Sequence, residues 1–124
     1  MVVVLLLCTV AIGSGEDKLK KKLCKEHPML SGPCFTVRGR MSIYVGNPGI
    51  RIWPVGTKRL LGISEYKYYL EDYDNIPDDL VKQLNVKNAM YADFTVCPFT
   101  KDKPGVMRLV CVESARNITM RENK

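Results

Sequence analysis

Arginine and aromatic side chains carry the chemistry that this sequence offers. They fall on one side of a predicted three-stranded region, and the set is Arg38, Arg40, Tyr44, Arg51, Trp53 and Leu60. An indole, a phenol and several guanidinium groups together can stack on planar rings and hold anionic groups. We therefore expect a binding face for a polyanion, a glycan or an envelope protein. The alternative is a structural or interaction protein in which Trp53 and Leu60 are covered by other parts of the chain.

Catalytic and metal-binding constellations are sparse. His27 is the single histidine. With Cys24 and Cys34 it offers three zinc ligands, but no second cysteine pair or histidine pair completes a closed site. The acidic residues between positions 71 and 79 lack the spacing of a calcium loop. No glycine-rich phosphate loop, nucleophile elbow or carboxylate pair is present, so we expect no enzyme, no metal site and no cofactor.

The binding face depends on strands, and the first of them is predicted over residues 35–45. Apolar residues and Gly39 alternate there with polar or aromatic ones, which is the period of a half-buried strand. Turn residues at 46–49 and at 56–57 bound two more strands, over 50–55 and 58–63, giving a meander.

The lengths of these turns predict the register of the meander. A four-residue turn at 46–49 sets Tyr44 opposite Arg51 and Ser42 opposite Trp53. A two-residue turn at 56–57 sets Trp53 opposite Leu60 and Gly62 beside Arg51. Both hairpins then direct the same apolar set inward.

The second half of the chain predicts a helix followed by a hairpin. Pro77 and two aspartates favour a helix start, and an apolar stripe runs through residues 76–84. Strands are predicted next, at 91–97 and 106–114. The order β-β-β-α-β-β is that of the mainly β, five-stranded OB barrel, in which one short helix plugs an end. An α+β sandwich with the same elements is the alternative.

The N-terminal region indicates export. Residues 2–12 form an apolar run that is too short to span a bilayer, and small residues come directly after it at 13–15. We predict a signal peptide over 1–15, a basic lead-in over 16–33, the OB-like domain over 34–114 and a polar tail over 115–124. The net charge of +6 makes the domain basic. We expect a periplasmic or secreted location, with no transmembrane helix in the mature chain.

Four cysteines remain once Cys8 leaves with the signal peptide, and an even count is typical of an oxidising compartment. Four cysteines allow three connectivities. Cys24 and Cys34 bracket a turn-rich segment, and Cys97 lies opposite Cys111 on the predicted hairpin. We therefore expect the disulfides Cys24–Cys34 and Cys97–Cys111.

Two runs of sequence resemble a known family. GRMSIYVGNPGIRIWPVGTKRLLGI and CPFTKDKPGVMRLVCVES are similar to segments of a family of small, exported, uncharacterised bacterial proteins, over roughly residues 30–114. The resemblance implies export and a β-rich fold, and it implies no catalytic residue.

Overall fold

The computed structural model describes residues 21–65 and 68–123, so the predicted signal peptide lies outside the described residues. The fold is mainly β, with five strands in one mixed sheet and a single short α-helix, in the predicted order. The elements are η1 (Cys24–Glu26, a 3-10 turn), β1 (Phe35–Ile43), β2 (Ile50–Pro54), β3 (Leu61–Ile63), α2 (Asp78–Val81), β4 (Asn88–Pro98) and β5 (Arg108–Glu122).

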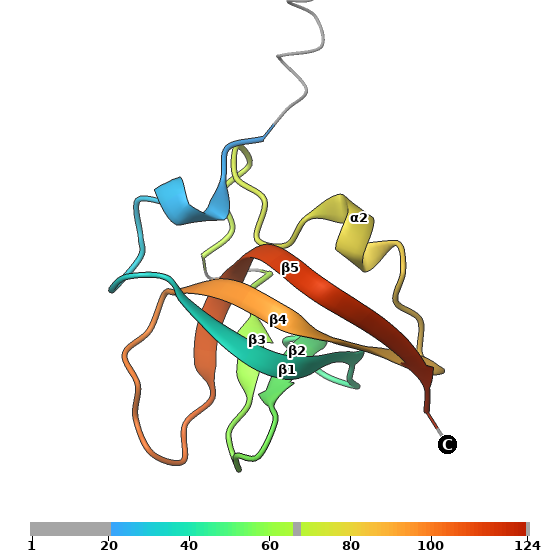
Figure 1. Ribbon diagram of the computed structural model, residues 1–124. Coiled ribbons are helices and arrows are strands. Elements are labelled where there is room, and N and C mark those ends of the chain that lie inside the picture. The colour runs from blue at the N-terminus through green and yellow to red at the C-terminus, as the bar shows by residue number, and fades with distance from the viewer. Residues whose placement is uncertain (1–20, 66–67, 124) are drawn as a thin grey trace, which may run out of the picture.

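Each strand of the sheet has two neighbours. β1 pairs antiparallel with β2 and with β4, and β2 pairs antiparallel with β3. β4 pairs antiparallel with β5, whereas β3 and β5 run parallel. The order β1-β2-β3-β5-β4 therefore closes on itself, with β4 returning to β1 (Figure 1).

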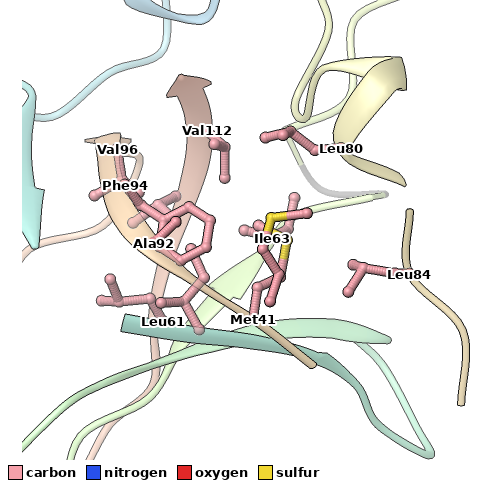
Figure 2. Close-up of a cluster of buried hydrophobic side chains, with 12 residues drawn as sticks. Met41, Leu61, Ile63, Leu80, Leu84, Ala92, Phe94, Val96 and Val112 are labelled. Carbon is pink, nitrogen blue, oxygen red and sulfur yellow. The ribbon is translucent and has the colours of Figure 1, made fainter. Parts of the chain in front are cut away.

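The interior of the sheet is aliphatic apart from Phe94. Inward positions of the strands supply Met41, Ile52 and Phe94, which are fully buried. Leu80 of α2 and the nearby Leu84 pack against the same cluster (Figure 2). Alternation along the strands produces this cluster, because every second side chain points to the same side.

The register of the first hairpin differs from the predicted one by two residues. Ser42 pairs with Arg51 and Arg40 with Trp53, so the predicted pairing of Ser42 with Trp53 is wrong. The cause is the turn, which spans residues 44–49 rather than 46–49 and contains Gly46 in a left-handed conformation. A shift of two residues preserves the alternation of faces along the strand. The end of the strand departs from the prediction, because β1 ends at Ile43, Val45 is fully exposed and Ser42 is buried.

Several predicted boundaries are also corrected. The helix is one turn, and Pro77 is its N-cap rather than part of its first turn. β3 begins at Leu61, later than predicted, although Ile52 still pairs with Leu61. β5 continues to Glu122, so residues 115–122, predicted as a polar tail, belong to the sheet and pair with β4.

The predicted disulfide pairing is wrong, although one of its premises is right. Cys97 does pair in register with Cys111, but the bonds are Cys24–Cys111 and Cys34–Cys97. The reason is that β4 has a second neighbour. Phe35 of β1 pairs with Val96, which brings the preceding Cys34 beside Cys97, with their Cα atoms 4.0 Å apart. The 3-10 turn of the lead-in then places Cys24 against Cys111.

Candidate ligand-binding face

Tyr44 and Arg51 form the first cation–ring pair on the outer side of the sheet. The guanidinium carbon of Arg51 lies 4.8 Å from the centroid of the Tyr44 ring. Its Nε donates a hydrogen bond of 2.9 Å to the carbonyl of Pro48, within the turn between β1 and β2. The turn thus fixes the direction of the guanidinium group and leaves it partly exposed.

Trp53 lies next to this pair on β2. Its indole N–H donates a hydrogen bond of 2.7 Å to the carbonyl of Thr57 in the following turn, and the ring stays partly exposed. Arg40 pairs with Trp53 across the β1–β2 ladder. Arg40 therefore lies beside Trp53 on the same side of the sheet, because directly opposed residues of an antiparallel pair share a face.

Two further residues, which the sequence pattern does not indicate, continue this surface. Arg40 pairs on its other side with Tyr91 of β4, and the guanidinium carbon of Arg121 on β5 lies 5.5 Å from the Tyr91 ring centroid. The pairing of β1 with β4 joins segments far apart in sequence, so hairpin geometry gives no signal for it. Arg121 falls within the predicted tail. We call the following six residues the outer face: Arg40, Tyr44, Arg51, Trp53, Tyr91 and Arg121.

The charges of the outer face are not neutralised by any carboxylate of the described residues. In residues 21–65 and 68–123, the ion pairs that involve arginine are Arg38–Asp93 and Arg59–Asp102. The guanidinium groups of Arg40, Arg51 and Arg121 therefore have no carboxylate partner there. Unpaired guanidinium groups beside aromatic rings are available to an external anion.

Arg38 was expected to extend this surface, but it is bound elsewhere. It lies 3.4 Å from the Asp93 carboxylate and donates a hydrogen bond of 3.0 Å to the carbonyl of Asn117. The Asn117 side chain also donates to Asp93, at 2.8 Å. The Asn117 hydrogen bond is the main cause that lowers the pKa of Asp93; burial opposes it, and the charge of Arg38 lowers the pKa further. Of the two arginines on β1, Arg38 is therefore the one whose charge is paired with a carboxylate, that of Asp93.

Leu60 lies at the border of the outer face rather than inside it. It lines a shallow cavity of about 240 Å³ between the β2–β3 turn and the β4–β5 loop, together with Lys58, Arg59 and Val106. Arg59 bridges the two loops, through Asp102 and through a hydrogen bond of 3.1 Å to the carbonyl of Lys103. Both loops extend from the same end of the sheet (Figure 1).

Gly62, which pairs with Arg51 as predicted, lets two loops cross the sheet. A Cβ atom at this position would lie 2.5 Å from Pro48 Cγ and 2.7 Å from Met107 Sδ. Only a residue without a side chain leaves room for both. The outer surface of β3 is therefore covered, and the accessible part of the face runs over β2, β1 and β4.

The residues considered for metal binding are otherwise engaged. Within the described residues, the one grouping with metal-ligand proximity is that of the Cys24, Cys97 and Cys111 sulfur atoms, and all three form disulfides. His27 is buried, its Nε2 lies 2.9 Å from the Tyr68 carbonyl, and its Nδ1 accepts the Met29 N–H at 3.1 Å. These partners assign the Nε2–H tautomer and leave neither nitrogen as a ligand.

Comparison of the chain with protein-family models, curated proteins and solved structures found no match. Among the helices in the described part of the chain, none has the length and apolar character needed to cross a membrane.

Proposed function

We propose that this protein is an exported, non-enzymatic, OB-like domain that binds a polyanion on its outer face. The observation that carries the proposal is the alternation of three aromatic rings with three guanidinium groups, which have no carboxylate partner among the described residues, across the outer side of β2, β1, β4 and β5. Arginine supplies charge and a planar donor fork, and the rings supply surfaces for stacking.

The OB-like assignment is supported by the order and direction of the strands. The sheet closes in the order β1-β2-β3-β5-β4, β3 runs parallel to β5, and α2 lies in the connection between β3 and β4. Five-stranded OB barrels share this element order and commonly bind oligonucleotides or oligosaccharides. Fold analogy alone assigns no ligand, so the ligand class rests on the residues of the face.

Export is supported by the two disulfides, which persist in oxidising compartments. A periplasmic or secreted location and membership of the family of small, exported bacterial proteins form part of the proposal. Mass spectrometry of the protein isolated from its native host tests this part, because processing predicts an N-terminus close to residue 16.

The single tryptophan allows the binding proposal to be tested at one position. Trp53 fluorescence is titrated with three probes: oligo(dT), which carries both charge and planar rings, dextran sulfate, which carries charge alone, and maltoheptaose, which carries neither. We expect saturable quenching by oligo(dT), less effect from dextran sulfate and none from maltoheptaose. Equal binding of maltoheptaose would instead identify a neutral glycan site, and no response to any probe would reject the proposal.

Arg40 and Arg38 provide a matched pair of variants, because they lie two residues apart on the same side of β1. Arg40→Gln removes a charge that has no carboxylate partner among the described residues, so oligo(dT) binding should weaken. The slope of log K against log salt concentration should become less steep by about 0.7, the change for one lost phosphate contact on a single strand. Arg38→Gln removes a charge that Asp93 already matches. It should change oligo(dT) affinity less. Equal losses in both variants would attribute binding to net charge rather than to the outer face.

The structural alternative, in which this face is packed rather than exposed, has one observation in its favour. The Trp53 N–H is already bonded to Thr57, and the ring is partly buried. Trp53→Ala separates the two functions. A binding role predicts a loss of about 1–3 kcal/mol in oligo(dT) binding with a nearly constant melting temperature. A packing role predicts a loss of about 3 kcal/mol or more in stability and no binding to lose.

A further inference from the structure

A second cavity, separate from the outer face, lies between the β4–β5 loop, the lead-in and the connection after β3. Its volume is about 470 Å³, within the range of small-molecule sites. None of the six outer-face residues lines it. Its lining includes Tyr68, Phe99, Lys101, Lys103, Met107 and Leu109.

The floor of this cavity is apolar and is held in place by the cluster of side chains beneath it. Phe99 is 4% exposed and stacks on Tyr68, with ring centroids 4.6 Å apart and ring planes nearly parallel. Leu109 packs against the same cluster, and the backbone N–H of Phe99 donates to the Leu109 carbonyl at 2.8 Å. Two disulfides anchor the cluster. The floor is therefore an apolar surface that is held by ring stacking, by a backbone hydrogen bond and by packing against the disulfides.

The rim of the cavity is cationic because two lysines of the β4–β5 loop face it while the aspartate between them pairs elsewhere. Lys101 and Lys103 line the cavity, whereas Asp102 between them pairs with Arg59 of the β2–β3 turn. Within the described residues, neither lysine has a carboxylate partner. A lysine side chain can lay its aliphatic stem along an apolar surface while its ammonium group stays at the rim. The cavity thus combines an apolar floor with two positive charges at its edge.

We propose that this cavity binds a single-chain amphipathic anion, with the apolar chain on Phe99, Met107 and Leu109 and the anionic head group between Lys101 and Lys103. The charge of the rim selects an anion, and the apolar floor selects a hydrocarbon chain. Two hydrogen-bond donors of the lining are already used, because the Phe99 N–H donates to the Leu109 carbonyl at 2.8 Å and the Ser31 hydroxyl donates to the Pro98 carbonyl at 3.3 Å. This inference does not depend on the outer face binding a polyanion.

The test uses three probes with isothermal titration calorimetry: decanoate, 1-decanol and acetate. Decanoate carries both parts of the proposed ligand, decanol carries only the chain, and acetate carries only the head group. We expect decanoate to bind about tenfold tighter than decanol, which is the discrimination expected from a charge-assisted contact, and acetate to show no saturation. Equal affinity for decanol and decanoate, or no binding of decanoate, would overturn the proposal.

Variants locate the site and provide a matched control. Lys101→Gln with Lys103→Gln removes two charges from the rim, and both side chains are exposed, so folding is preserved. This double variant should lose the tenfold preference for decanoate while keeping its decanol affinity. Lys82→Gln with Lys87→Gln removes two exposed lysines that do not line the cavity. It should bind decanoate as the unchanged protein does, and equal losses in both double variants would reject a site at this cavity.

A last experiment distinguishes binding of a free amphiphile from binding to a membrane surface that carries the same anionic head groups. Co-sedimentation with phosphatidylglycerol vesicles is measured with and without decanoate, and decanoate binding is measured with and without vesicles. A cavity that takes a single chain predicts that decanoate binds with the same affinity in the absence and in the presence of vesicles. Decanoate binding that is seen only when vesicles are present would contradict the proposal.

Discussion

The sheet interior and the cluster around the disulfides are built from different kinds of information. The interior is filled by side chains such as Met41 and Phe94, whose positions follow from alternation along single strands. The second cluster joins Cys24, Phe99 and Cys111, which come from segments far apart in sequence. Local periodicity therefore specifies the first region, and only the folded chain brings the second together. The two regions also differ in use, because the interior is closed whereas the second cluster forms the floor of an open cavity.

The largest expected effect is loss of the Cys24–Cys111 disulfide, which tests how far the second cluster depends on its cross-link. This bond spans 87 residues of sequence. In the chain-entropy account a loop of this length stabilises by about 4.5 kcal/mol. Cys24→Ala with Cys111→Ala should lower the free energy of unfolding by that order, measured by urea titration. A change below about 1 kcal/mol would mean that the apolar contacts of the cluster suffice without the bond.

The sheet interior is tested by Met41→Ala. Met41 is fully buried, so its truncation leaves a cavity among close-packed side chains. We expect a loss of about 3 kcal/mol in unfolding free energy. Ile43→Ala on the same strand is the control, since Ile43 is 38% exposed and should cost less. Met41 and Ile43 lie on the same side of β1 and differ in burial, so similar losses at both positions would show that full burial of Met41 adds nothing to its contribution.

Gly62→Ala probes the point at which two loops cover the sheet. The added methyl group would overlap Pro48 and Met107, so one loop must move. We expect a loss of about 2 kcal/mol, the usual cost of overpacking. Gly32→Ala is the matched control, because the nearest atom to its Cβ, Pro98 Cγ, is 4.0 Å away. Thermal melts of the two variants measure the difference, and equal melting temperatures would show that the loops yield without cost.

The same division separates the parts of the fold that the sequence predicts from those that it does not. The alternation over 35–45 predicts the first strand, because the period of two is a property of one segment. The strand ends at Ile43, and of the predicted inward set Met41 is fully buried whereas Ile43 and Val45 are exposed. The prediction for the second hairpin, with Ile52 opposite Leu61, is confirmed. The first hairpin differs by two residues, because the length of its turn depends on backbone conformation, including the positive φ of Gly46, that composition does not give.

The candidate site is predicted only in part, for the same reason. Arg40, Arg51 and Trp53 lie on the outer side of their strands as expected from strand parity. Tyr44 lies just beyond the end of β1 and joins them through its contact with Arg51. Tyr91 and Arg121 are absent from the prediction, because the closing pair β1–β4 and the length of β5 are not visible in any one hairpin. The predicted disulfide connectivity fails on the same point, since Cys97 has neighbours on two strands and the predicted hairpin contains only one of them.

The smallest expected effect concerns Asp93, whose partners Arg38 and Asn117 are 55 and 24 residues away in sequence. The hydrogen bond from Asn117, aided by the charge of Arg38, holds the pKa of Asp93 below its ordinary value of 3.8. A carboxyl whose pKa is lower in the folded state stabilises the fold above its unfolded pKa, and this contribution is lost as the pH falls through the folded pKa. The unchanged protein should therefore be more stable than Asp93→Asn at pH 6, and the difference should shrink below pH 3.8.

Melting temperatures of the unchanged protein and of Asp93→Asn from about pH 2 to pH 6 measure this effect. The Arg38→Gln variant distinguishes the contribution of Arg38 from that of Asn117. Because the Asn117 hydrogen bond is the larger cause and stays in place, Arg38→Gln should reduce the pH dependence at Asp93 without abolishing it. A pH dependence that vanishes in Arg38→Gln would make the ion pair the dominant contact and would reverse this order. Since the pair is exposed, solvent screening keeps its contribution small. Long-range contacts on the outer side of the sheet would then adjust stability only slightly, in contrast to the cross-linked cluster on the same sheet.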